Sequence, residues 1–315
     1  MPPGLKAVDK PNDPIMESQN KIVHGLWVGP ALSPLEELCL RSFVAMGHEF
    51  HLWLYEPLGH ELPKGVVARP AQDILPAESI FRYRYGNQFG HGLGSLAGFS
   101  DIFRYKLLYE KGGWWADMDI TCLQPLEFDA PYVFRPHDVL PVVGNLMKCP
   151  KGSPLMEACF REAQQQVTAD NRDWLLPIRI LNNNISRFQL DTYIIDITNK
   201  DRWEVVEYFI HHNATFSRKW YAFHWMNEEW RGRGIDKNVV PRASALWQLL
   251  VRYRIKADGL PLPFFRVPRA WRWLKKALLP RLPYRLRRAV KSGWQAMDYL
   301  RVHHTRRVHI EAREG

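Results

Sequence analysis

Cysteine pairs, long apolar runs and an apolar leader are all missing from this chain of 315 residues, and each absence excludes a class of protein. The four cysteines, at positions 39, 122, 149 and 159, form no C-x-x-C pair, so a zinc finger is excluded. No run of about 18 apolar residues occurs, and no membrane span is expected. The opening Met-Pro-Pro-Gly-Leu-Lys lacks an apolar leader, which favours a cytoplasmic protein with reduced cysteines.

Acidic residues are scarce at one end only. From Arg266 to Gly315 there are 14 Lys and Arg against three acids, a net +11, which leaves about −1 of the total +10 for residues 1–265. Prolines at 261, 263, 268, 280 and 283 divide this tail into short basic pieces with Trp and Leu on them. Such pieces are typical of peripheral anchors on anionic membranes.

The most informative segment runs from Ser100 to Asp119 and reads SDIFRYKLLYEKGGWWADMD. A helix over about 96–111 places Asp101 and Arg104 on one face and stops at the double glycine. In an extended segment Asp117 and Asp119 would point to the same side, about 6.6 Å apart at Cα. Two carboxylates that close repel each other unless a cation lies between them. Because Mg²⁺ is held by carboxylates together with substrate phosphates, the segment predicts a metal-held nucleotide.

The remaining pattern indicates an α/β fold. Strands are predicted over 21–28 and 49–55 with a helix over 34–46 between them, which favours a mostly parallel sheet flanked by helices. Further strands are predicted at 132–134, 142–147 and 194–197, with a helix over 153–166. Asn145 and the three asparagines at 182–184 either face an acceptor substrate or form the hydrogen bonds of turns.

The 100–119 string resembles the core motif of DXD-type sugar-nucleotide glycosyltransferases of family 32, written S-D-x-x-R-Y-x-x-L-x-x-x-G-G-x-Y-x-D-x-D. Residues 21–29 resemble the opening strand of that family, and residues 222–230 its closing H-x-x-x-x-x-W element. The resemblance covers about residues 20 to 232. It implies a GT-A-type, Rossmann-like catalytic domain over 21–260, between a loose N-terminus (1–20) and a basic helical extension (261–315).

The resemblance also implies roles for individual residues. The metal, Mn²⁺ or Mg²⁺, would be ligated by Asp119 with Asp117, and Asn227 is the candidate third ligand. Asp101, Arg104, Asp117 and Asp119 would form the catalytic group. The nucleoside-diphosphate sugar would contact a wider set: Trp27 under the base, Ser100, Asp101, Arg104, Trp115 in place of the usual Tyr, Asp117, and Trp230 through its indole N–H.

Each of these assignments has a structural alternative. Asp117 and Asp119 could form a solvated acidic turn, and Asp101 with Arg104 an exposed ion pair worth about 0.2–0.5 kcal/mol. Trp27 could be plain core. The 224–230 block could be a helix start with an acidic first turn. Tyr105 and His24 are predicted to be structural.

The function implied is a metal-dependent, retaining transfer of a hexose to a glycan or lipid-linked acceptor in surface polysaccharide or lipopolysaccharide synthesis. Residues 266–315 would hold the enzyme on the cytoplasmic face of the inner membrane. A glycosidase fits less well, because its two carboxyls must flank the bond from two sides. A protein-glycosylating effector stays open as an alternative. A nucleic-acid-binding protein, argued from the pI of 9.5, is the alternative of a different class, and no nucleic acid is expected as a partner.

Overall fold

The computed structural model of the protein describes residues 20–90 and 92–260. The predicted basic extension over 261–315 and all but one residue of the predicted loose N-terminus lie outside the described residues. Within the described part, no helix is long and apolar enough to cross a bilayer. The four cysteines are buried as free thiols.

The centre of the molecule is a six-stranded sheet in the order β3-β2-β1-β4-β7-β6. Three strand pairs are parallel: β1 (Ile22–Trp27) with β2 (Glu49–Leu54), β2 with β3 (Val66–Pro70), and β1 with β4 (Gly113–Ala116). The long strand β7 (Val142–Cys149) pairs antiparallel with β4 and with β6 (Val133–Pro136). The predicted mostly parallel α/β architecture is confirmed.

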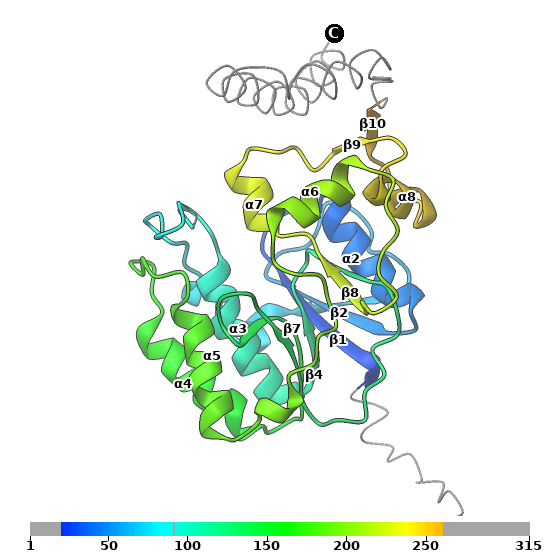
Figure 1. The fold of residues 1–315 in the computed structure, drawn as a ribbon. Helices are drawn as coiled ribbons and strands as arrows, with labels where there is room; N and C mark the ends of the chain where they lie inside the picture. The colour runs from blue at the N-terminus through cyan, green and yellow to red at the C-terminus, as the bar shows by residue number, and fades with distance from the viewer. Residues whose placement is uncertain (1–19, 91, 261–315) are drawn as a thin grey trace, which may run out of the picture.

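Helices cover both faces of this sheet (Figure 1). On one side lie α3 (Ala97–Lys111), α4 (Pro154–Gln166) and α5 (Leu176–Arg187). On the other lie α2 (Pro34–Ala45), α6 (Trp203–His211) and α8 (Ala245–Arg252), together with the short α7 (Asn227–Gly232). Two small sheets complete the fold: β5 (Ile120–Cys122) with β8 (Ala222–His224), and β9 (Val239–Pro241) with β10 (Asp258–Leu260).

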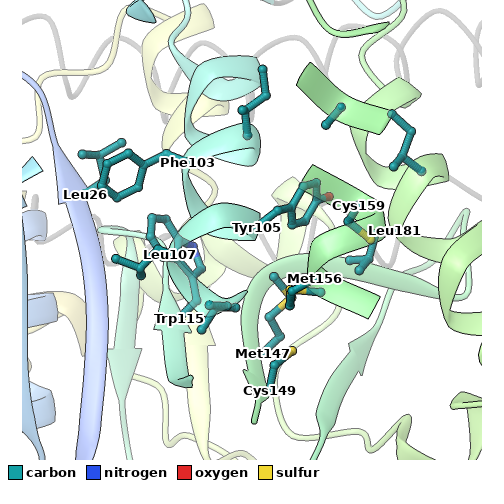
Figure 2. Packing of buried hydrophobic residues seen from close by; sticks show 14 of the residues in the cluster. Leu26, Phe103, Tyr105, Leu107, Trp115, Met147, Cys149, Met156, Cys159 and Leu181 are labelled. Carbon is teal, nitrogen blue, oxygen red and sulfur yellow. The ribbon is translucent and has the colours of Figure 1, made fainter. Parts of the chain in front are cut away.

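Strand β4 lies between two hydrophobic clusters, one on each face of the sheet. Successive side chains of a strand point to opposite faces, so Trp114 and Trp115 enter different clusters although they are neighbours. Trp115 packs with the residues of α3 and α4, among them Phe103, Leu107 and Met156 (Figure 2). Trp114 packs with the residues of α2 on the far side. Burial on both faces explains why this strand reads as a continuous apolar run.

Local signals set where α2 begins and where α3 ends. Ser33 and Glu36 form a capping box at the start of α2, and the helix predicted from residue 34 is confirmed. Helix α3 stops at Gly112, whose φ of +69° favours glycine. A Cβ at Gly112 would also lie 2.5 Å from the backbone nitrogen of Lys151. The double glycine is therefore required by conformation and by packing.

One predicted strand is wrong. Residues 194–197 form no strand, because only isolated bridges join Ile194 to Phe134 and Thr198 to Ala222. The apolar run there reflects burial of Ile197 beside the sheet rather than a ladder of hydrogen bonds.

Candidate active site

A cavity of about 490 Å³ opens where β1 and β4 end at the carboxyl edge of the sheet. From β1 the chain runs outward to β2 and β3 and then returns to β4 on the other side, so this edge is a topological switch point. Ligands of open α/β sheets bind at such points. Trp27 at the end of β1, Asp117 after β4 and Asn145 on β7 all line the cavity.

Asp117 and Asp119 lie on a tight turn and not on an extended segment, so the predicted local conformation is wrong. The backbone N–H of Ile120 donates to the carbonyl oxygen of Asp117 at 3.0 Å and closes the turn between β4 and β5. Both aspartates still line the cavity. They meet there because of the turn, and the alternation of a strand plays no part.

The Asp117 carboxylate is braced by α3 and β4. Nη2 of Arg104 lies 3.0 Å from Asp117 Oδ1 and 3.2 Å from Asp101 Oδ1, and the indole N–H of Trp115 donates to Asp117 at 2.6 Å. The Arg104 side chain is only 6% exposed, so the alternative of an exposed ion pair is wrong. Burial raises the pKa of Asp117, and the negative charge of Asp119 adds to the rise. The positive charge of Arg104 lowers this pKa but does not cancel the rise. Burial likewise raises the pKa of Asp101 to about 6.

The Asp119 carboxylate is held from the other side of the cavity. The backbone N–H of Asn227 donates to Oδ2 at 2.6 Å, and Nε2 of His224 lies 3.2 Å from the same oxygen. Burial opposes ionisation, but His224 and this N–H outweigh it and hold the pKa of Asp119 below its usual range. Met226, just before Asn227, has the left-handed φ of +56°, a strained conformation for Met that is common at functional sites.

The donor atoms around Asp119 fit a hard divalent cation. Among the described residues, the buried side-chain Oδ1 of Asn227 has no hydrogen-bond partner, and buried acceptors normally have one. Nδ1 of His224 lies 2.6 Å from Asp201 Oδ1, and its Nε2 lies 3.2 Å from Asp119 Oδ2. Because ionised carboxylates only accept, both ring nitrogens carry protons; burial opposes this charge, but the two aspartates outweigh it and raise the pKa of His224 to about 10. Between residues 20–90 and 92–260, however, no three Asp, Glu, His or Cys side chains are already arranged as a ligand set.

Residues 87–138, which include the aspartate pair, match the family described as "Glycosyltransferase sugar-binding region containing DXD motif". The match supports a glycosyltransferase activity and covers this segment of the chain. Enzymes with this motif generally use a divalent metal ion and a nucleotide-sugar donor. No curated protein matches the chain.

Two solved structures are similar to parts of this chain. One, described as "PaToxG Glycosyltransferase", is 10% identical with a TM-score of 0.39 over 53% of this chain and 68% of that chain. The other, a transferase mutant, is 9% identical with a TM-score of 0.36 over 56% of this chain and 88% of that chain. These scores are too low to bear on what the glycosyltransferase does.

The predicted tryptophans have different places in the structure. Trp230 is fully buried and its indole N–H donates to the carbonyl oxygen of Trp225 at 2.8 Å, so the predicted contact with a phosphate is wrong. The ring of Trp115 packs against Phe103, and the residue serves the site by its N–H bond to Asp117. Trp27 is half-buried at the cavity, with its N–H bonded to the carbonyl oxygen of Ala31, so its ring is not plain core.

Other predicted residues separate into the wall and the interior. Ser100 lines the cavity with Asp101. Asn145 lies within β7 and lines the cavity too. The side chain of Asn182 in α5 instead accepts from the backbone N–H of Val142 on β7 and donates to its carbonyl oxygen. Neither serves a turn. Tyr105 and His24 are buried with hydrogen bonds inside the fold, as predicted.

Two site residues went unnoticed in the sequence: Asp201 and Arg135. No local pattern marks them, because they reach the site only through long-range contacts. His224, the first residue of the closing H-x-x-x-x-x-W element, belongs to the block that the sequence marks, although Asn227 and Trp230 were the favoured residues in it.

Proposed function

We propose that this glycosyltransferase transfers a hexose, with a divalent metal ion and with retention at the anomeric carbon, from a nucleoside diphosphate to a glycan or lipid-linked acceptor. The observation that carries the proposal is the convergence, in one cavity, of Asp117, Asp119 and the unpaired Oδ1 of Asn227. The two carboxylates have separate braces, Arg104 with Trp115 for Asp117 and the Asn227 N–H with His224 for Asp119, so both are preorganised before any ligand enters.

Mn²⁺ or Mg²⁺ would be held by Asp119, Asp117 and Asn227, with His224 orienting Asp119. When bound, the ion would neutralise charge developing on the diphosphate leaving group. Both carboxylates line the same cavity, and a cation between them would favour the ionised form of each.

The chain's own residues would orient the donor. The half-buried Trp27 offers a ring for the base, and stacking on an aromatic contributes about 1–3 kcal/mol in nucleic-acid complexes. Asp101 and Ser100 would bond donor hydroxyls. Arg104 holds Asp101 and Asp117 in fixed relation, so its charge serves the sugar site chiefly through these two carboxylates.

A donor screen tests the reaction. Nucleoside-diphosphate release would be measured with Mn²⁺ for a panel of sugar nucleotides, using wild type, Asp119→Asn, and the exposed Asp196→Asn as control. We expect one preferred donor. Because losing the metal site removes several kcal/mol of transition-state stabilisation, Asp119→Asn should be at least about 100-fold slower. Full activity in Asp119→Asn would refute the proposal.

The role in surface polysaccharide or lipopolysaccharide synthesis, and the position on the cytoplasmic face of the inner membrane, rest on the basic sequence of residues 266–315. Each basic residue near anionic lipid contributes about 1 kcal/mol. Removing residues 266–315 should release the protein from anionic vesicles and leave donor hydrolysis in place. Unchanged vesicle binding would contradict the membrane assignment.

A protein acceptor is the alternative within the same chemistry, and product analysis with glycan, lipid-linked and protein acceptors separates the two. Nucleic-acid binding is not favoured, because the cavity and its motif lie in the near-neutral part of the chain.

A further inference from the structure

Arg135 on β6 is a fully buried cation with three acceptors. Its Nη1 donates to Asn145 Oδ1 at 2.9 Å, and its Nη2 donates to the carbonyl oxygen of Asn199 at 3.2 Å and to Asp201 Oδ2 at 2.8 Å. The side chain is 1% exposed, and that of Asp201 is 6% exposed. A charge buried this deeply requires such partners.

An irregularity in β6 sets the position of Arg135. Phe134 pairs with Met147 on β7, but Arg135 pairs with Val143, so the register shifts between two consecutive residues. Such bulges are common beside active sites, where they re-aim a side chain. In a regular ladder Arg135 would pair with Leu146, so the shift leaves Gly144, Asn145 and Leu146 of β7 without partners on β6.

The contacts of Arg135 lead to both aspartates of the DXD motif. On one side is Asn145, whose backbone carbonyl accepts the N–H of Asp117 at 2.8 Å. On the other side Asp201 is 2.6 Å from Nδ1 of His224, and Nε2 of His224 is 3.2 Å from Asp119. The guanidinium of Arg135 therefore connects two series of contacts, one that ends at Asp117 and one that ends at Asp119.

We propose that Arg135 and Asp201 are positioning residues that hold the two DXD aspartates and His224 in the arrangement a divalent cation requires. This inference rests on the proposed metal-dependent function. Outer partners of metal ligands fix ring orientation and ligand spacing, and their loss typically weakens metal affinity 10–100-fold. Neither residue would touch the donor's reacting atoms.

A purely structural role explains this arrangement less well. A buried ion pair is weak support for stability, since well-packed apolar residues often do as well in its place. Within the part of the chain that the structure describes, the buried Nε–H of Arg135 also has no hydrogen-bond partner, an unfavourable feature for a group that served only packing. Both observations fit a role of Arg135 in positioning its partners, Asn145 and Asp201.

The test is the affinity of the full-length protein for Mn²⁺ alone, measured from the electron paramagnetic resonance signal of free Mn²⁺. The variants are Asp201→Asn and the double variant Arg135→Gln/Asp201→Asn, which leaves no unpaired buried charge. Asp138→Asn is the matched control, because Asp138 pairs with Arg202 at 2.7 Å in the same region but contacts neither His224 nor Arg135 in the described contacts. Urea unfolding checks that each variant is folded.

We expect Mn²⁺ to bind 10–100-fold more weakly to Asp201→Asn and to the double variant, and within about twofold of wild type to Asp138→Asn. Wild-type affinity in either folded Asp201 variant would overturn the positioning role while leaving the metal site in place. Equal weakening in Asp138→Asn would overturn it as well. If wild type and Asp119→Asn both fail to bind Mn²⁺, the proposed metal dependence fails together with this inference.

Discussion

The pH dependence of stability should depend strongly on His24, a residue remote from catalysis. His24 on β1 is 3% exposed, and its Nδ1 accepts the indole N–H of Trp53 at 3.2 Å. Burial lowers its pKa from 6.5 to about 3, and the neighbouring side chains of His51, Arg69 and Lys111 reinforce the shift. Protonation of the folded protein would place a charge in the interior and remove the acceptor from Trp53.

The sign and size follow from linkage. Because the folded pKa lies below the unfolded one, the unfolded chain binds the proton first as the pH falls below 6.5. The contribution of neutral His24 to the free energy of unfolding is fully present above pH 6.5. It falls by about 1.4 kcal/mol per pH unit down to about pH 3. Between pH 7 and pH 5 the loss amounts to about 2 kcal/mol.

The comparison is between wild type and His24→Asn, whose amide oxygen still accepts from Trp53 but does not titrate. Urea unfolding at pH 7 and pH 5 gives the free energy of unfolding of each protein. Other shifted groups, such as His48, are present in both proteins and cancel in the difference. We expect the acid-induced loss to be about 2 kcal/mol smaller in His24→Asn. An equal loss in the two proteins would refute the assignment of a buried, neutral His24.

Two further predictions concern the cavity wall. A Cβ at Gly144 would lie 2.7 Å from Nη1 of Arg104, which its two aspartates hold in place, so Gly144→Ala should cost about 1–3 kcal/mol in urea unfolding and weaken Mn²⁺ binding. Gly59→Ala, whose added Cβ would lie 3.7 Å from the carbonyl oxygen of Pro30, an ordinary van der Waals contact, is the control and should change neither; wild-type behaviour of Gly144→Ala would contradict the contact. Trp27→Ala should weaken binding of the preferred nucleotide about tenfold or more, whereas Trp230→Phe should cost about 1–3 kcal/mol of stability with nucleotide affinity unchanged. The reverse pattern would exchange the roles of the two tryptophans.

Local patterns were sufficient for the elements that frame the site. The capping box at Ser33, the double glycine after α3 and the apolar alternation of β1 and β2 each act within a few residues, so the sequence predicts them directly. The order strand, helix, strand then requires a parallel pair. The DXD string located the site for the same reason, since its spacing is local.

Tertiary contacts decided the features that local patterns left open. Asp117 and Asp119 meet through a turn because β4 ends at Ala116 and the chain folds back into β5. Whether an indole lies at a ligand or in the core depends on which elements pack over it, which separates Trp27 from Trp230.

By itself, then, the sequence determined the α/β layering and the identity of the carboxylate pair, because periodicity and motif spacing are short-range properties. Only the tertiary structure decided which distant groups hold that pair. Arg135, Asp201 and His224 come from three separate segments, and burial of their charges is tolerable only where the fold brings them together.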